Sequence, residues 1–219
     1  MSPGGFLVTA ALVVASARFL DAGIALGFRD LLRSDPQLWR YTSRIPDLLL
    51  PTVLVLSGVL WAMYLRRVRR GIRDETARFY LLSGAAMPAA FVAKAVLKPL
   101  FGRMNTRVWL AKGGDLSFHW FHGGGEYGSF PSGHMAVFTA LAAASWLLFP
   151  KYRVASLAAI TALGFALVAT DYHYLSDVIA GGYLGLAVLA GTDRCLERLA
   201  TGRALPGGRG RGSPPPGGR

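Results

Sequence analysis

Residues 154–172 read VASLAAITALGFALVATDY, a run without a charged residue before Asp171. A segment of about 20 apolar residues is long enough to cross the ~30 Å hydrocarbon layer of a bilayer as an α-helix. Five further segments of this kind occur, and the first of them, 6–27, is the weakest candidate because Arg18 and Asp21 interrupt it. The sequence therefore predicts an all-α integral membrane bundle of about six transmembrane helices. The other five segments are 6–27, 46–65, 77–97, 132–150 and 174–193.

The composition agrees with a membrane protein and excludes several other classes. Hydrophobic residues make up 53% of the 219 residues and charged residues only 16%, against roughly 25% charged in an average soluble domain. This amount of apolar material excludes a disordered chain. A single cysteine, Cys195, excludes an internal disulfide framework and a zinc site built on cysteine pairs.

Positive charge is distributed unevenly, and its distribution predicts an orientation. The formal net charge is +12, and most arginines lie in 66–78 and after residue 194. Because cytoplasmic loops are rich in Lys and Arg, we expect both termini in the cytoplasm and the loops 28–45 and 98–131 outside. Residues 1–196 then form the membrane domain. We expect 197–219, rich in Gly, Pro and Arg, to be a disordered cytoplasmic tail.

The first segment that suits chemistry leaves the outer end of the third apolar run. It reads Lys98-Pro-Leu-Phe-Gly-Arg103-Met-Asn-Thr-Arg107. Lysine provides a point charge and arginine a planar fork, and both suit phosphate oxygens. The alternative is that these side chains only snorkel and anchor the helix end at the interface.

The second segment, Pro131-Ser132-Gly133-His134, opens the fourth apolar run. Ser132 can cap the helix, and Gly133 lets a ligand approach the backbone. Free N–H groups at a helix N-terminus bind anions, and His134 would lie beside such an anion as a proton donor. The alternative is a capped helix with an incidental histidine.

The third segment is Asp171-Tyr-His173-Tyr-Leu-Ser-Asp177, between the last two apolar runs. His173 and Asp177 share one helix face if the helix starts near residue 173. A carboxylate bonded to one ring nitrogen fixes the tautomer and leaves the other nitrogen as a nucleophile or base. The alternative is a buried histidine satisfied by a nearby carboxylate.

Chain spacing brings the three segments to one end of the bundle. His134 and His173 are 39 residues apart, which allows one crossing, a short turn and a return. An anion cradle, a second histidine and a His–Asp pair make up a phosphoryl-transfer site that uses no metal and no cofactor. The expected nucleophile is His173, oriented by Asp177, and the expected acid is His134. The expected phosphate-binding groups are Lys98, Arg103, Arg107, Ser132 and Gly133.

Two further histidines, His119 and His122, lie in the predicted outer loop. They could form a metal pair, but no carboxylate or cysteine stands at ligand spacing. Contact with lipid headgroups is the interpretation we favour for this His-Trp-Phe-His run.

These motifs resemble those of the type-2 phosphatidic acid phosphatases, which are KxxxxxxRP, PSGH and SRxxxxxHxxxD. Residues 131–134 match the second motif completely, and His173 with Asp177 matches the end of the third. The resemblance covers roughly residues 45–195. It implies the same roles for these residues and for His134, with Lys98 and Ser132 binding phosphate.

The first motif departs from the family pattern. Asn105 and Thr106 stand where the family has Arg and Pro. Arg103, two residues earlier, and Arg107, two residues later, are the candidates to replace the family arginine.

The third motif departs as well, because Leu167 stands where the family has Arg. Losing a charge-assisted hydrogen bond costs ~1.5–3 kcal/mol, unless Arg107 or Lys112 replaces it. The departure keeps open two alternatives to a phosphatase: a headgroup phosphotransferase with the same site, and a non-enzymatic lipid-binding protein.

The sequence as a whole predicts a lipid phosphatase that acts at the outer leaflet. The substrate classes are phosphatidic acid, phosphatidylglycerol phosphate and polyprenyl diphosphate. The expected partners are the lipid substrate and the bilayer, and the expected location is a bacterial inner membrane with the site facing the periplasm. Nucleic-acid binding is not expected, because no aromatic residues are interleaved with the tail arginines.

Overall fold

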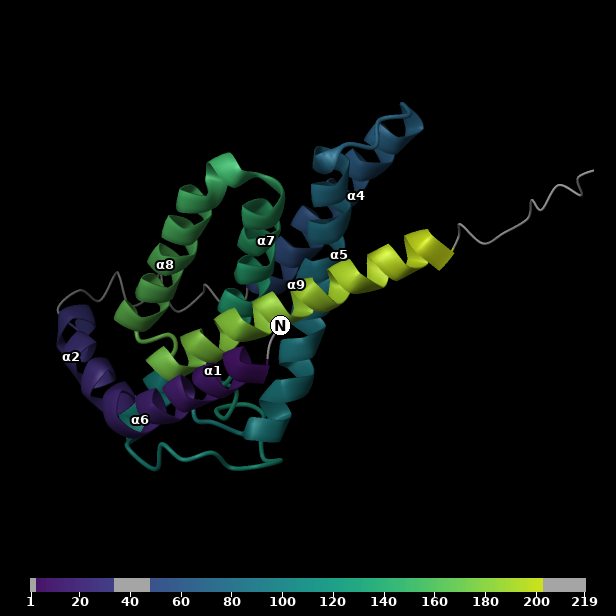
Figure 1. The fold of residues 1–219 in the computed structure, drawn as a ribbon. Helices are drawn as coiled ribbons and strands as arrows, with labels where there is room; N and C mark the ends of the chain where they lie inside the picture. The colour runs from purple at the N-terminus through teal and green to yellow at the C-terminus, as the bar shows by residue number, and fades with distance from the viewer. Residues whose placement is uncertain (1–2, 34–47, 203–219) are drawn as a thin grey trace, which may run out of the picture.

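The computed structural model describes residues 3–33 and 48–202. Within these ranges every regular element is helical, as the sequence predicted (Figure 1). The elements are α1 (Pro3–Ala15), η1 (Ser16–Leu20), α2 (Asp21–Arg33), α4 (Leu49–Arg69), α5 (Glu75–Phe101), α6 (Thr106–Lys112), α7 (Gly133–Leu148), η3 (Pro150–Tyr152), α8 (Arg153–Ala169) and α9 (Leu175–Gly202).

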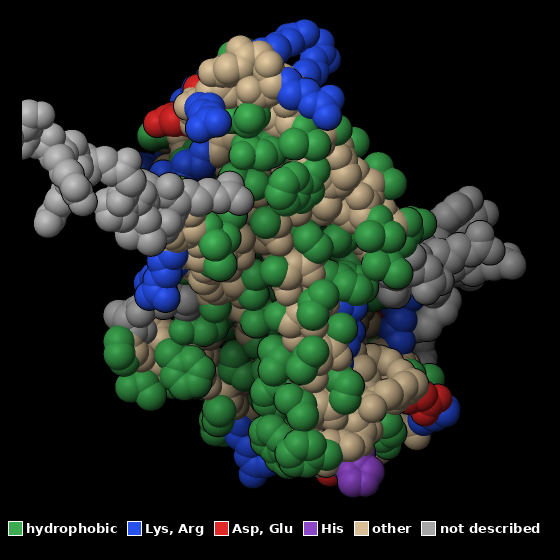
Figure 2. All heavy atoms as spheres, turned by 90° about the vertical axis from the view of Figure 1, so that its right-hand side faces the viewer, with side chains coloured by type: hydrophobic (Ala, Val, Ile, Leu, Met, Phe, Trp, Pro, Cys, Tyr) green, Lys and Arg blue, Asp and Glu red, His purple; other side chains and the backbone are tan. Residues whose placement is uncertain are grey.

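Among the described residues, five helical stretches are long and apolar enough to cross a membrane. The predicted run 132–150 corresponds to α7, which is apolar but has only 16 residues. At 1.5 Å per residue it rises about 24 Å, less than the ~30 Å hydrocarbon layer. Figure 2 shows apolar side chains over the middle of one face, with Lys and Arg side chains towards both ends and most densely at the top. The five stretches are Pro3–Arg29, Leu49–Arg69, Glu75–Phe101, Pro150–Ala169 and Leu175–Ala200.

The first helix continues through the two charges that make its sequence look weak. A π-helical stretch, η1, joins α1 to α2 without a break. Such stretches are rare and occur often at functional sites. Here the stretch places Ser16 and Asp21 five residues apart on one side of the helix, and both are buried. Asp21 therefore faces the bundle interior, where an ionisable residue needs a partner.

Several boundaries differ from the predicted ones. α5 continues to Phe101, so Lys98 lies in its last turn and not in a loop. The loop after it contains the short helix α6. α9 continues to Gly202, beyond the expected start of the tail at 197. Most of the expected interfacial segment 28–45, and the tail from 203, lie outside the described residues.

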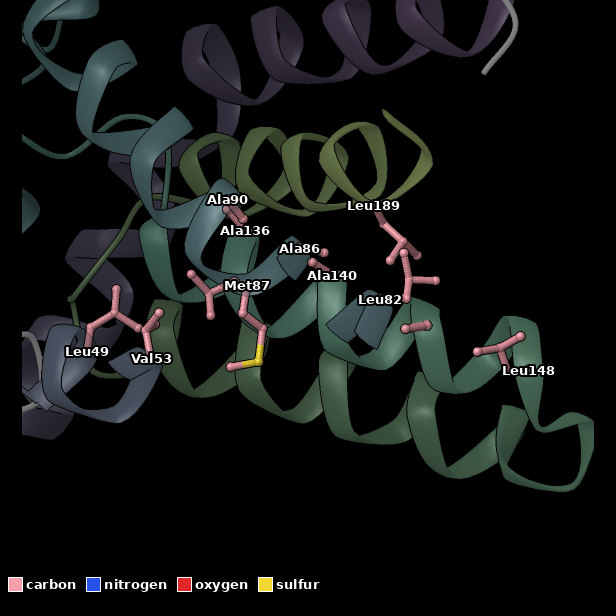
Figure 3. Close-up of a cluster of buried hydrophobic side chains, with 12 residues drawn as sticks. Leu49, Val53, Leu82, Ala86, Met87, Ala90, Ala136, Ala140, Leu148 and Leu189 are labelled. Carbon is pink, nitrogen blue, oxygen red and sulfur yellow. The ribbon is translucent and has the colours of Figure 1, made fainter. Parts of the chain in front are cut away.

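The main core lies between α4, α5, α7 and α9 (Figure 3). Many of its buried residues are alanines, including Ala86, Ala90, Ala136 and Ala140. Small side chains let helix backbones approach closely, and this is how membrane helices gain packing energy in the absence of water. A second apolar cluster at the α7–α8–α9 contact contains Met135, Leu167, Val168 and Val178.

Two glycines bring α9 against α7. A Cβ atom on Gly181 would clash with the carbonyl oxygen of Ser132, and one on Gly185 with that of Ala136. The pair is a small-xxx-small motif, which permits close backbone contact. The backbone N–H of Ser132 also donates to the carbonyl of Asp177 (3.1 Å). This contact fixes the start of α7 beside the start of α9.

Candidate active site

A cavity of about 410 Å³ opens where α5, α6, α7 and the α8–α9 turn meet. It collects polar and cationic groups that are far apart in the sequence. The lining residues are Leu49, Lys94, Lys98, Asn105, Arg107, Val108, Gly125, Gly128, Gly133, His134, Tyr172 and His173.

The turn between α8 and α9 aims His173 at this cavity. Asp171 adopts a left-handed backbone conformation (φ 52°) that reverses the chain. The carbonyl of Leu167 then accepts hydrogen bonds from the N–H groups of Tyr172 (2.9 Å) and His173 (3.1 Å). α9 begins at Leu175, two residues later than the sequence argument needed. Even so, the Nδ1 atom of His173 lies 3.4 Å from Oδ2 of Asp177.

Asp177 is fully buried and held by several donors. Its Oδ2 accepts hydrogen bonds from the hydroxyl of Ser129 (2.5 Å) and the backbone N–H of Tyr174 (3.2 Å). Its Oδ1 accepts one from Arg103 (2.7 Å). A carboxylate with this many donors stays in one orientation, so it can fix the ring of His173 and leave Nε2 as the free nitrogen.

Burial lowers the pKa of His173 below its ordinary value, despite the opposing effect of Asp177. The imidazole is therefore neutral at pH 7, which is the form that can act as a nucleophile. The rings of His173 and His134 both contact the ring of Tyr172, with centroid distances of 5.8 Å and 6.0 Å. The two histidines and Tyr172 line the same cavity.

The N-terminus of α7 forms one wall of the cavity. The Ser132 hydroxyl accepts from the backbone N–H of Met135 (3.4 Å), which confirms the expected cap. Ser132 is fully buried and does not line the cavity. Gly133 does, and a Cβ atom there would lie only 3.0 Å from Cδ of Lys94. The absence of a side chain at Gly133 lets Lys94 lie across the start of the helix.

Three cationic side chains among the described residues line the cavity: Lys94, Lys98 and Arg107. Arg107 donates from Nη2 (2.8 Å) and Nε (3.3 Å) to the carbonyl of Thr170, which orients its guanidinium. Lys94 was missed in the sequence because it falls inside an apolar segment. Its spacing of four from Lys98 on one helix face was the available signal.

Arg103, expected at the phosphate, lies behind the cavity and not in its wall. Its side chain is 0% exposed and pairs with Asp177 and with Asp21 (2.7 Å each). The reason is electrostatic, because two buried carboxylates need a nearby cation. Asp21 was also missed, although a charge inside an apolar segment is itself a signal of function.

The remaining sequence candidates lie elsewhere. Leu167 is buried in the second apolar cluster. Lys112, a possible substitute for the missing arginine, is 63% exposed and pairs with Glu126 on the surface. His119 packs against Tyr127 at the outer loop, and His122 also lies outside the cavity wall. Of the two possible substitutes, Arg107 and Lys112, Arg107 is the one that lines the cavity.

Comparison with known proteins gives one family and two curated relatives. The PAP2 superfamily matches residues 79–200, more than half of the chain. Lipid A 1-phosphatases of Rhizobium etli and Rhizobium johnstonii are each 50% identical over 68 residues, 31% of this chain. That stretch covers only 29% and 28% of the relatives' own length. No solved structure matches significantly. The match over residues 79–200 agrees with the helices of membrane-spanning length and with the His–Asp pair beside a capped helix. This chain is therefore a membrane protein that belongs to the PAP2 superfamily.

Proposed function

We propose that the protein is a membrane lipid phosphatase that works through a phosphohistidine on His173. One observation carries the proposal: a buried His173–Asp177 pair shares a cavity with His134 and with three cationic side chains. The two histidines, Asp177 and the three cations lie within residues 79–200, the stretch that matches the family. Leu49 in the cavity wall and Asp21 behind the cavity come from outside it. Two relatives named lipid A 1-phosphatase add support, since both names describe removal of a phosphate from a lipid.

The first step is transfer of the phosphoryl group to the enzyme. Nε2 of neutral His173 attacks phosphorus, so a P–N bond forms while the bond from phosphorus to the lipid oxygen breaks. His134 gives a proton to that oxygen, and the lipid alcohol leaves. Asp177 stabilises the positive charge that develops on the His173 ring, as a carboxylate does for any imidazolium it holds.

The second step is hydrolysis of the phosphohistidine. Water attacks phosphorus, the P–N bond breaks, and His134 takes a proton from the water. The cations Lys94, Lys98 and Arg107 and the N–H groups at the start of α7 bind the phosphoryl oxygens in both steps. The products are inorganic phosphate and the free enzyme.

The position of the cavity suits a lipid substrate. It lies at one end of apolar helices that can cross a bilayer, so a lipid can present its phosphate while its acyl chains stay in the membrane. The Lys- and Arg-rich segment 66–78 lies at the other end of α4 and α5. By the positive-inside rule the site then faces outward, towards the periplasm in a bacterial inner membrane.

Phosphate release from a panel of lipid phosphates tests this proposal. Purified protein in detergent should release phosphate from at least one lipid phosphomonoester, and His173→Gln should abolish the release. Lys112→Gln, on the surface at the same end, is the matched control and should keep full activity. Full activity of His173→Gln would refute the mechanism.

The same assay separates hydrolysis from transfer. Adding a lipid alcohol as acceptor should leave inorganic phosphate as the product. A labelled phosphate recovered only on the acceptor lipid would instead identify a phosphotransferase with the same site.

A further inference from the structure

The ion-pair network behind the cavity joins the first helix to the site. Arg103 donates from Nη1 to Asp177 and from Nη2 to Asp21, at 2.7 Å each. Ser176 closes the network: its hydroxyl accepts from Arg103 and donates to Asp21 (2.5 Å each), and its backbone N–H donates to Asp21 (3.1 Å). Every side chain of this network is buried.

The surroundings of Arg103 leave it no access to solvent. Its guanidinium carbon lies 4.2 Å from the ring centroid of Tyr174 and 5.1 Å from that of Phe118. Aromatic faces and carboxylates therefore enclose the cation. In such surroundings the charges act on one another with little screening, so the number of carboxylates around Arg103 matters.

A charge count shows what Asp21 adds. Arg103 and Asp177 alone would form a neutral pair, and the carboxylate would have little attraction left for a positive ring at His173. With Asp21 on the other side of the guanidinium, the three charges carry a net charge of −1. The positive charge of Arg103 is then shared between two carboxylates.

We propose that Asp21 is a positioning residue for the His173–Asp177 pair: it shares the guanidinium of Arg103 and leaves the negative charge of Asp177 effective at His173. The π-helical stretch before it supports this assignment, because it directs Asp21 and Ser16 into the interior. Asp21 also lies outside residues 79–200, so the family match does not account for it.

The role of Asp21 in catalysis rests on the proposed function, whereas its effect on His173 does not. Other charged or titratable groups lie around the same ring, and they stay unchanged in the test. They are Asp177 on α9, Lys94 and Lys98 on α5, Arg107 on α6, His134 on α7, and Tyr172 and Tyr174 beside His173.

The test uses Asp21→Asn, which keeps the shape and one acceptor oxygen but removes the charge. We expect kcat for a lipid phosphomonoester to fall roughly tenfold with little change in KM, because the loss affects the ring and not the phosphate contacts. Asp193→Asn is the matched control on α9, where Asp193 pairs with half-exposed Arg78, and it should leave kcat unchanged.

A second readout does not depend on turnover. NMR of histidine-labelled protein, with His173 assigned by His173→Gln, gives the titration midpoint of that ring. Removing a nearby negative charge disfavours the imidazolium, so Asp21→Asn should lower the midpoint. The double variant Asp21→Asn/Arg103→Gln restores the net charge of −1 and should raise the midpoint again.

Each outcome decides between the two claims. A wild-type protein without lipid phosphatase activity would refute the proposed function, and the titration would still test Asp21. A midpoint and a kcat that Asp21→Asn leaves at wild-type values would overturn the role of Asp21. If Asp21→Asn does not fold, Arg103→Gln and the double variant give the same comparison, with the lower midpoint expected in the double variant.

Discussion

At the residue scale, the protonation state of His173 decides whether the site can react. Burial lowers the pKa of His173 below the ordinary value of about 6.5. The neutral ring is the reactive form, so activity should persist down to a pH below about 6.5 and fall as the pH drops through the lowered pKa. The measurement is kcat/KM against pH, corrected for the ionisation of the lipid phosphate measured by phosphorus NMR. An acid limb centred above pH 6.5 would contradict this assignment.

Arg107 is the residue that we propose as the replacement for the arginines missing from the motifs. It lines the cavity, and a charge-assisted hydrogen bond contributes ~1.5–3 kcal/mol. Arg107→Gln should therefore lower kcat/KM by about one to two powers of ten. Lys112→Gln, at the other end of α6, should have no effect because Lys112 pairs with Glu126 on the surface. Equal losses in both variants would show that Arg107 has no specific role.

At the scale of elements, the contact between α7 and α9 sets the geometry of the site. Gly181→Ala would push its new Cβ atom against the backbone of Ser132, and overpacking of this kind costs about 1–3 kcal/mol. We expect a lower thermal unfolding midpoint in detergent and a loss of activity, since Ser132 and Asp177 must separate.

Gly191→Ala is the control for that variant. A Cβ atom on Gly191 meets no atom within 4 Å, and alanine favours the helix by up to about 1 kcal/mol. The control should be as stable as the wild type or more so. If both alanine variants behave alike, close packing at Gly181 is not what positions the site.

The sequence predicted most helices and the pairing of His173 with Asp177, but it could not predict the partners of Arg103. Apolar segments long enough to span a bilayer can be recognised in the sequence. The His–Asp pair can be recognised too, because its two residues are only four positions apart. Asp21 and Arg103 are 82 residues apart, and only tertiary packing brings them together. Lys94 was hidden for a related reason, since an apolar segment gives no sign of which face lines a cavity.

At the scale of the whole molecule, the orientation in the membrane has a direct chemical test. Cys195, the only cysteine, is exposed in the C-terminal part of α9, whereas the N-terminal end of this helix follows His173 in the cavity wall. A membrane-impermeant maleimide should label it only after intact cells are opened. Ala111→Cys in a Cys195→Ser background places the thiol on α6 at the cavity end and should be labelled from outside. The reverse labelling pattern would show that the protein has the opposite orientation, with the cavity on the cytoplasmic side.

The central claim, a phosphohistidine at His173, is tested most directly by trapping the intermediate. The protein is mixed with its lipid phosphate substrate, quenched in alkali, in which phosphohistidine survives, and digested for mass spectrometry. We expect one phosphoryl group on the peptide that contains His173, and none on any peptide of the His173→Gln variant. A phosphoryl group on another residue, or phosphate release by the wild type with no phosphorylated peptide, would contradict the account.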